Sequence, residues 1–127
     1  LKVRIDGVEV NKQNYEALIL KNVYPTLYLA DIRKFKPAVK YDLIVMADVI
    51  EHMSKKDGYK LVDRLLKSCK HLLITTPMGF MKQAEYFIKH NKYEKHVSGW
   101  LPEDFKKYKK AKIRLFSKVF LVRIDAK

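Results

Sequence analysis

One short segment of the sequence gathers side chains that can accept protons or bind metal ions. Asp48, Glu51 and His52 are spaced i, i+3 and i+4, so they share one face if the segment forms a helical turn. Histidine titrates near neutral pH, which makes His52, and His96 further along, candidate general bases, with Glu51 as a third. Carboxylates mixed with imidazoles can also bind Mg²⁺, Mn²⁺, Fe²⁺ or Zn²⁺. The simpler alternative is that Glu51 and His52 begin a helix and hydrogen-bond to a loop.

Carboxylates also stand at the ends of apolar runs elsewhere in the chain. Glu9 lies near the end of one predicted strand, Asp31 directly follows a second, and Asp48 follows a third. In a doubly wound sheet, ligands bind at the carboxyl ends of the strands. One acid in such a place often caps the next helix. Three acids in successive strand–helix units indicate a ligand site more strongly than any one of them.

The elements that must position these residues follow from the hydrophobic pattern. Strands are predicted at Val3–Val10, Thr26–Ala30, Tyr41–Ala47, His71–Thr76, Lys112–Ser117 and Lys118–Asp125. Helices are predicted at Lys12–Lys21 with Asn11 as its cap, from Ser54 to about Ser68, and at Pro102–Tyr108, with Met81–His90 ambiguous. The alternation predicts an α/β, mostly parallel sheet with an antiparallel hairpin at one edge. The uninterrupted apolar run in Tyr41–Ala47 is typical of a central strand covered on both faces.

Composition narrows the class of protein and of partner. The chain has 127 residues and no visible linker, so we expect a single domain, 1–127. No stretch approaches the roughly 20 apolar residues of a membrane span. The net charge of +13 suggests an anionic partner: nucleic acid, an acidic membrane surface, or a phosphorylated or carboxylated small-molecule substrate. An ordinary solvated surface is the simpler alternative, because the lysines are dispersed. The single cysteine, Cys69, fits a reducing compartment, so a cytoplasmic location is expected.

Several segments together resemble a known enzyme family. They are IDGVEV, LYLADI, YDLIVMADVIEHM, HLLITTP and the final hairpin KIRLFSKVFLVRID. They are similar to the class I S-adenosylmethionine-dependent methyltransferases over almost the whole chain, and DVIEHM is the most specific piece. The resemblance implies a Rossmann-like, doubly wound sheet and S-adenosylmethionine-dependent methyl transfer to an unidentified acceptor.

The same resemblance implies a role for each acid. Glu9 would hold the ribose hydroxyls of S-adenosylmethionine, because a carboxylate accepts from both hydroxyls at once. Asp31 would accept from the adenine amino group, and Ile32 would pack on the ring. Ala47 and Asp48 would lie beside the methionine and sulfonium end. We therefore expect Glu9 and Asp31 at neighbouring strand ends on one edge of the sheet.

A fainter resemblance concerns a metal site. Asp48, Glu51, His52 and His96 are similar to the ligands of metal-dependent small-RNA 2′-O-methyltransferases, although Asp48 stands where that family has Glu. This alternative requires His52 and His96 to lie within about 10 Å of each other. A third alternative is a non-catalytic, methyltransferase-like binding module. We predict catalytic roles for Glu51, His52 and His96 and assign no residue to a metal.

The resemblance also predicts missing elements. In dinucleotide-binding folds the ribose acid lies about 20 residues after a glycine-rich loop. Counting back from Glu9 runs past Leu1, and none of the four glycines forms such a loop. We expect the first strand, the glycine loop and the first helix to be missing, and hence no seven-stranded sheet built from this chain. The vacant strand position could be closed by direct pairing, by a second chain in a dimer, or by residues upstream.

Overall fold

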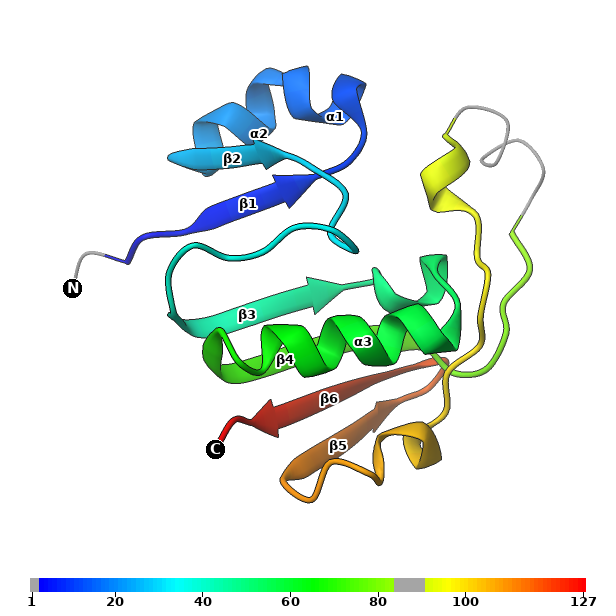
Figure 1. Cartoon of the computed structure of the whole chain (residues 1–127). Helices are drawn as coiled ribbons and strands as arrows, with labels where there is room; N and C mark the ends of the chain where they lie inside the picture. Colours follow the sequence, from blue (N-terminus) through cyan, green and yellow to red (C-terminus); the bar gives the residue numbers. More distant parts are fainter. Residues whose placement is uncertain (1–2, 84–90) are drawn as a thin grey trace. The chain divides into compact units, whose positions relative to one another are not determined.

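The computed structural model describes residues 3–83 and 91–127, which divide into two compact units, Leu1–Lys36 and Pro37–Lys127 (Figure 1). The first unit contains β1 (Asp6–Glu9), α1 (Lys12–Glu16), α2 (Leu18–Val23) and β2 (Thr26–Leu29). The second unit contains β3 (Tyr41–Ala47), η1 (Ile50–His52), α3 (Lys55–Leu65), β4 (Cys69–Pro77), η2 (Lys92–Glu94), η3 (Pro102–Phe105), β5 (Ala111–Phe116) and β6 (Val119–Asp125).

The first unit is a two-stranded parallel sheet whose strands are connected by two short helices. Strands β1 and β2 pair in parallel, with Glu9 opposite Leu29. The predicted cap at Asn11 is confirmed, because its side chain accepts from two backbone N–H groups of α1. The predicted single helix Lys12–Lys21 is wrong: Ala17 has extended backbone (φ −61°, ψ 126°) and separates α1 from α2. Helix α1 buries no side chain, so packing does not hold the segment in one continuous helix.

The second unit is built on a four-stranded sheet with the order β3-β4-β6-β5. Strands β3 and β4 are parallel, and β6 runs antiparallel to both β4 and β5. The predicted terminal hairpin at one edge is therefore confirmed. The bounds Tyr41–Ala47 are confirmed for β3, but the prediction of a central strand covered on both faces is wrong for the described residues. Strand β3 pairs on one side only. On the face opposite buried Met46, Leu43 is 46% and Val45 56% exposed.

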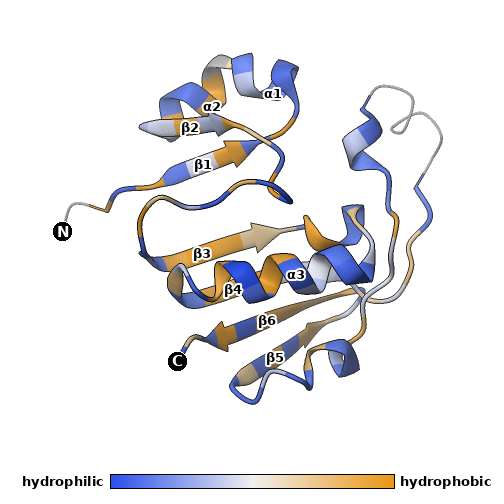
Figure 2. Cartoon of the chain, in the orientation of Figure 1, coloured by the Kyte–Doolittle hydropathy of each residue, from blue (hydrophilic) through white to orange (hydrophobic). Residues whose placement is uncertain are grey.

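Helix α3 lies over one face of this sheet, whose strands carry many apolar residues (Figures 1 and 2). Its buried side chains are Leu61, Val62 and Leu65. The buried apolar strand residues of this unit are Met46, Cys69, Leu72, Ile74, Phe120, Val122 and Ile124. The predicted start of the helix is confirmed, because the Ser54 hydroxyl accepts from the N–H of Asp57 and donates to its carboxylate. The core thus fixes β3 and β4, whose carboxyl ends carry the candidate site.

Other predictions differ in detail. The predicted helix Pro102–Tyr108 is a 3₁₀ turn, Pro102–Phe105. Residues 84–90 of the ambiguous helix Met81–His90 lie outside the described residues. The described residues form a two-stranded and a four-stranded sheet and no seven-stranded sheet, as expected. None of the helices within 3–83 and 91–127 has the length and apolar character needed to cross a bilayer. The assignment of the whole chain to a single domain stays a prediction.

Candidate functional site

The candidate site begins where β3 ends and the chain turns into η1. Asp48 has a left-handed backbone (φ 51°), a conformation that aspartate adopts more readily than most residues. Its N–H donates to the carbonyl of Thr75 (3.0 Å), which ties the turn to the neighbouring strand β4. The turn places η1, with Glu51 and His52, at the carboxyl end of the parallel pair β3–β4. Ala47, the last residue of β3, is exposed at this end.

Glu51 is a buried carboxylate, and only one of its two oxygens has a hydrogen-bond partner within the described residues. Its side chain belongs to a residue only 2% exposed, and Oε2 accepts from the Thr76 hydroxyl (3.2 Å). Oε1 has no hydrogen-bond partner within the described residues. Burial raises the pKa of Glu51 above its usual range, and the nearby carboxylate of Asp48 also raises it. A buried carboxylate with a free oxygen is suited to accept a proton or to bind a cation.

Two histidines lie beside Glu51, and both are held in the same way. The Nδ1 of His52 lies 3.2 Å from the carbonyl oxygen of Lys95, and the Nδ1 of His96 lies 2.7 Å from that of Met81. A carbonyl only accepts, so Nδ1 carries the proton in each ring and Nε2 of the neutral ring keeps a lone pair. The ring centroids are 5.0 Å apart in an edge-to-face arrangement. The predicted approach of His52 to His96 is confirmed.

Glu51, His52 and His96 form a compact cluster of potential ligands. One atom from each of the three lies within 4.8 Å of the others. Two imidazoles and one carboxylate form a donor set that suits a divalent transition metal, and histidines that ligate metals commonly donate their other ring N–H to a carbonyl. The cluster fits a metal on both counts. It can equally serve as a proton acceptor, since the same lone pairs accept a proton in the absence of a metal.

Two residues that support this cluster were given no role from the sequence, although Thr76 lies in the strand-end segment Thr75–Pro77 where a ligand site was expected. Thr76 donates to Glu51, and the Ser98 hydroxyl donates to the carbonyl of Met53 (2.7 Å), directly after η1. Thr76 is the only described hydroxyl residue that is completely buried, inside the apolar strand β4. A buried hydroxyl in an apolar run, with no local partner, was the available signal. Ser98 offered no comparable pattern.

The acids of the first unit also lie as expected. Glu9 ends β1 and Asp31 follows β2, and because the strands are parallel both lie at one edge of their sheet. The Glu9 carboxylate accepts from the N–H of Asn11 (2.7 Å). The Arg33 guanidinium binds both oxygens of Asp31, with Nη2–Oδ2 at 2.6 Å, and holds the pKa of Asp31 below its usual value. Ile32, the residue expected to pack on a ring, is half-buried beside Asp31.

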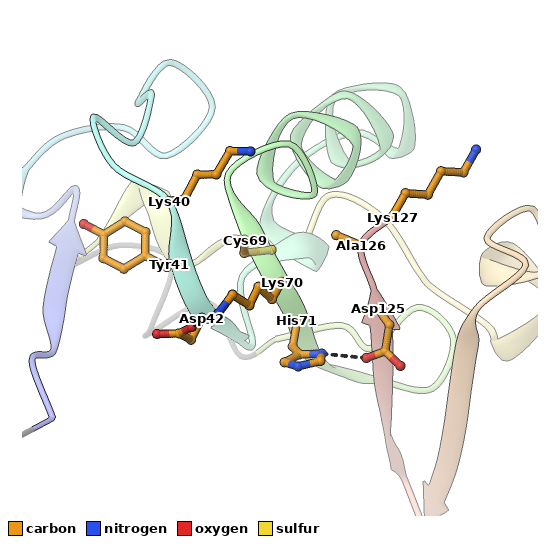
Figure 3. A pocket seen from close by; sticks show the side chains of 9 residues that line it. All are labelled: Lys40, Tyr41, Asp42, Cys69, Lys70, His71, Asp125, Ala126 and Lys127. Carbon is orange, nitrogen blue, oxygen red and sulfur yellow. Dashed lines mark hydrogen bonds and ion pairs between the residues drawn. The ribbon is translucent and has the colours of Figure 1, made fainter. Parts of the chain in front are cut away.

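A pocket of 460 Å³ lies at the other end of the second unit's sheet (Figure 3). It opens where β3 and β4 begin, at Tyr41 and Cys69, and β6 ends, at Asp125. Figure 3 shows His71 pointing toward Asp125, with Nδ1–Oδ1 at 2.7 Å. This pocket contains none of the predicted site residues. The candidate site is therefore the opposite edge, at the carboxyl ends of β3 and β4.

Comparison with known proteins supports the fold. Neither a protein-family model nor a curated protein matches the chain. Among solved structures, it superposes on the N-methyltransferase NodS from Bradyrhizobium japonicum WM9 with a TM-score of 0.64 at 14% identity, covering 97% of this chain and 73% of that one. The chain has the class I methyltransferase fold.

Two other methyltransferase structures agree with this assignment. The small RNA methyltransferase HEN1 gives a TM-score of 0.69 at 16% identity, over 98% of this chain and 20% of that one. Magnesium protoporphyrin IX methyltransferase (ChlM) from Synechocystis PCC 6803, with bound SAH, gives 0.69 at 13% identity, over 98% and 64%. The chain thus spans only a fifth of HEN1 and less than two thirds of ChlM. The superpositions establish the methyltransferase fold. Because the identities are low, substrate and activity must be argued from the residues of the site.

Proposed function

We propose that the protein is an S-adenosylmethionine-dependent methyltransferase that uses the cluster Glu51, His52 and His96 at its reacting end. The observation that carries the proposal is the position of this cluster at the carboxyl ends of β3 and β4 in a methyltransferase fold. Ligands of open α/β sheets bind at that edge. The cluster brings together groups that are 44 residues apart in sequence, from His52 to His96, which favours a shared chemical role.

The cofactor contacts are proposed separately for the two units. In the first unit, Glu9 accepts the ribose hydroxyls, since only one of its acceptor positions is used by Asn11. Asp31 receives the adenine amino group in place of part of its contact with Arg33, and Ile32 packs on the adenine. In the second unit, Ala47 and Asp48 lie beside the methionine end. The bound cofactor supplies an electrophilic methyl group on a sulfonium.

The residues of the cluster would prepare the methyl acceptor. The Nε2 atom of His52 or His96 takes a proton from the acceptor group, because Nδ1 of each ring already donates to a carbonyl. Glu51, with a raised pKa and a free Oε1, is the alternative proton acceptor. An anionic acceptor agrees with the net charge of +13.

Calorimetric titration of the full protein with S-adenosylmethionine tests the cofactor assignment. Glu9→Ala should weaken binding by about 1.5–3 kcal/mol, the scale of lost hydrogen bonds to a charged group. Glu16→Ala, in the same unit but on exposed helix α1, is the matched control and should leave the Kd unchanged. An unchanged Kd for Glu9→Ala would contradict the ribose role. Absence of any cofactor binding by the unaltered protein would favour a non-catalytic, methyltransferase-like module.

A second candidate is a metal-dependent RNA 2′-O-methyltransferase. The specific observation in its favour is that a backbone carbonyl faces Nδ1 of both histidines of the cluster, which leaves Nε2 of each ring available as a ligand atom. Glu51, His52 and His96 would hold the ion, which would supply a positive charge to polarise an acceptor hydroxyl.

Metal depletion separates the two candidates. Activity on RNA should disappear with a chelator, return with Mn²⁺ or Mg²⁺, and be lost in His96→Ala. His71→Ala serves as control, because His71 pairs with Asp125 outside the cluster. Methyl transfer that continues unchanged in a chelator, together with no metal binding by calorimetry, would eliminate the second candidate.

A further inference from the structure

The segment that carries His96 is attached to the turn that carries Glu51 and His52. The backbone N–H groups of Val97 and Ser98 both donate to the carbonyl of Glu51, at 2.8 and 3.1 Å. The two hydrogen bonds span 46 and 47 positions of the sequence. They use main-chain atoms of Glu51, so its carboxylate stays available as a ligand. The distance between the two histidines therefore depends on how firmly this attachment is held.

Ser98 adds a second attachment through its side chain. Its hydroxyl donates to the carbonyl of Met53 (2.7 Å) and accepts from the indole N–H of Trp100 (2.9 Å). A serine hydroxyl has one donor and can accept at the same time, so the two bonds are compatible. Ser98 thus connects the backbone directly after η1 to a residue of the core.

Trp100 is a rigid anchor for this connection. It is completely buried, and its carbonyl accepts from the N–H of Gly79 (2.7 Å). The glycines around it permit close contact: a Cβ on Gly58 would lie 2.6 Å from the indole, and a Cβ on Gly99 would lie 2.3 Å from the backbone nitrogen of Phe80. Packing this tight leaves the indole little room to move.

We propose that Ser98 is a positioning residue that holds His52 and His96 at their mutual distance by linking η1 to buried Trp100. Ser98 does not belong to the ligand cluster, so it acts through the backbone on either side. The inference deepens the proposed function, since the pair matters for catalysis only if that proposal is correct. The geometry itself exists without cofactor or methyl acceptor and can be measured in their absence.

Long-range ¹⁵N–¹H NMR of the histidine rings in the full chain tests the inference. The unaltered protein should show His52 and His96 as Nδ1–H tautomers with ring-to-ring NOEs, assigned with His52→Gln and His96→Gln. Ser98→Ala should weaken these NOEs at least twofold and give His96 a mixture of Nδ1–H and Nε2–H tautomers. The ring signals of His71 should stay unchanged. Ser98→Thr, which keeps the hydroxyl, should restore the pattern of the unaltered protein.

Ser54→Ala is the control for general loss of stability, because it removes the cap of α3 in the same unit without touching the cluster. It should lower the unfolding midpoint and leave both histidines unchanged. The inference is overturned if Ser98→Ala retains both tautomers and the NOEs, or if Ser54→Ala changes them to the same degree. Failure of Ser98→Thr to restore the pattern would overturn it too. None of these results depends on methyl transfer, so they stand apart from the test of the proposed function.

Discussion

The two units of the chain use similar elements with different degrees of burial. Both contain a parallel strand pair and a capped helix. The second unit buries a continuous core between α3 and its sheet, whereas none of the apolar residues described in the first unit is buried. Parallel pairing and a good cap thus produce secondary structure in both units, but burial of apolar area supplies most of the stability.

The largest expected difference between the units comes from leucine truncation on a strand. Leu72→Ala, on β4 where the residue is completely buried, should lower the free energy of unfolding by about 3 kcal/mol. Leu29→Ala, on β2 where the residue is 46% exposed, should cost less than about 1 kcal/mol. Urea unfolding is monitored by the fluorescence of Trp100, the single tryptophan, which reports the unfolding of the second unit. Equal effects of the two variants on that signal would mean that burial does not distinguish the units.

Helix caps provide a smaller and closely matched comparison. Ser54→Ala removes the side-chain acceptor at the start of α3 and should cost about 1 kcal/mol in the Trp100 signal. Asn11→Ala removes the equivalent acceptor from α1, which has no buried side chain, and should shift that signal by no more than a few tenths of a kcal/mol. Amide hydrogen exchange in α1 should increase in Asn11→Ala. A cost near 1 kcal/mol for both caps would show that the units unfold as one.

The smallest predicted effects concern pH, and they have opposite signs in the two units. Arg33 lowers the pKa of Asp31, so its contribution to stability is present above the unfolded value and is lost as pH falls through the folded pKa. Burial raises the pKa of Glu51, so stability is greatest below the unfolded value and decreases as pH rises through the folded pKa. Carboxyl ¹³C titration should place Asp31 below 3.8 and Glu51 above 4.5, the usual values. Arg33→Ala should raise the pKa of Asp31 and leave Glu51 unchanged, and a Glu51 value at or below 4.5 would contradict the burial argument.

Local features of the fold were predictable because their causes lie within a few residues. The caps at Asn11 and Ser54 and the terminal hairpin follow from side chains and apolar runs that are adjacent in sequence. The break at Ala17 and the exposed face of β3 were not predictable, because they depend on what the segment packs against.

The residues of the candidate site likewise differ in how far they could be predicted from the sequence. The carboxylates at strand ends could be located from the pattern, and the approach of His52 to His96 came from resemblance to known enzymes. Ser98 could not be found from either, because its bond to Met53 joins residues 45 positions apart and leaves no periodic signal. Thr76 is an intermediate case, since its hydroxyl stands out in a buried strand but its partner Glu51 does not follow from that.

The left-handed backbone at Asp48 restricts which mutations this position can accept during evolution. Glycine, asparagine and aspartate are among the residues that adopt that conformation most readily, whereas a β-branched side chain would be strained there. Asparagine and glycine are each one nucleotide change away from aspartate. Valine, which is equally close in the genetic code, would strain the turn that leads from β3 into η1. Under selection for this turn, variation at Asp48 should therefore pass through asparagine or glycine, so the charge can be lost in one step while the backbone is retained.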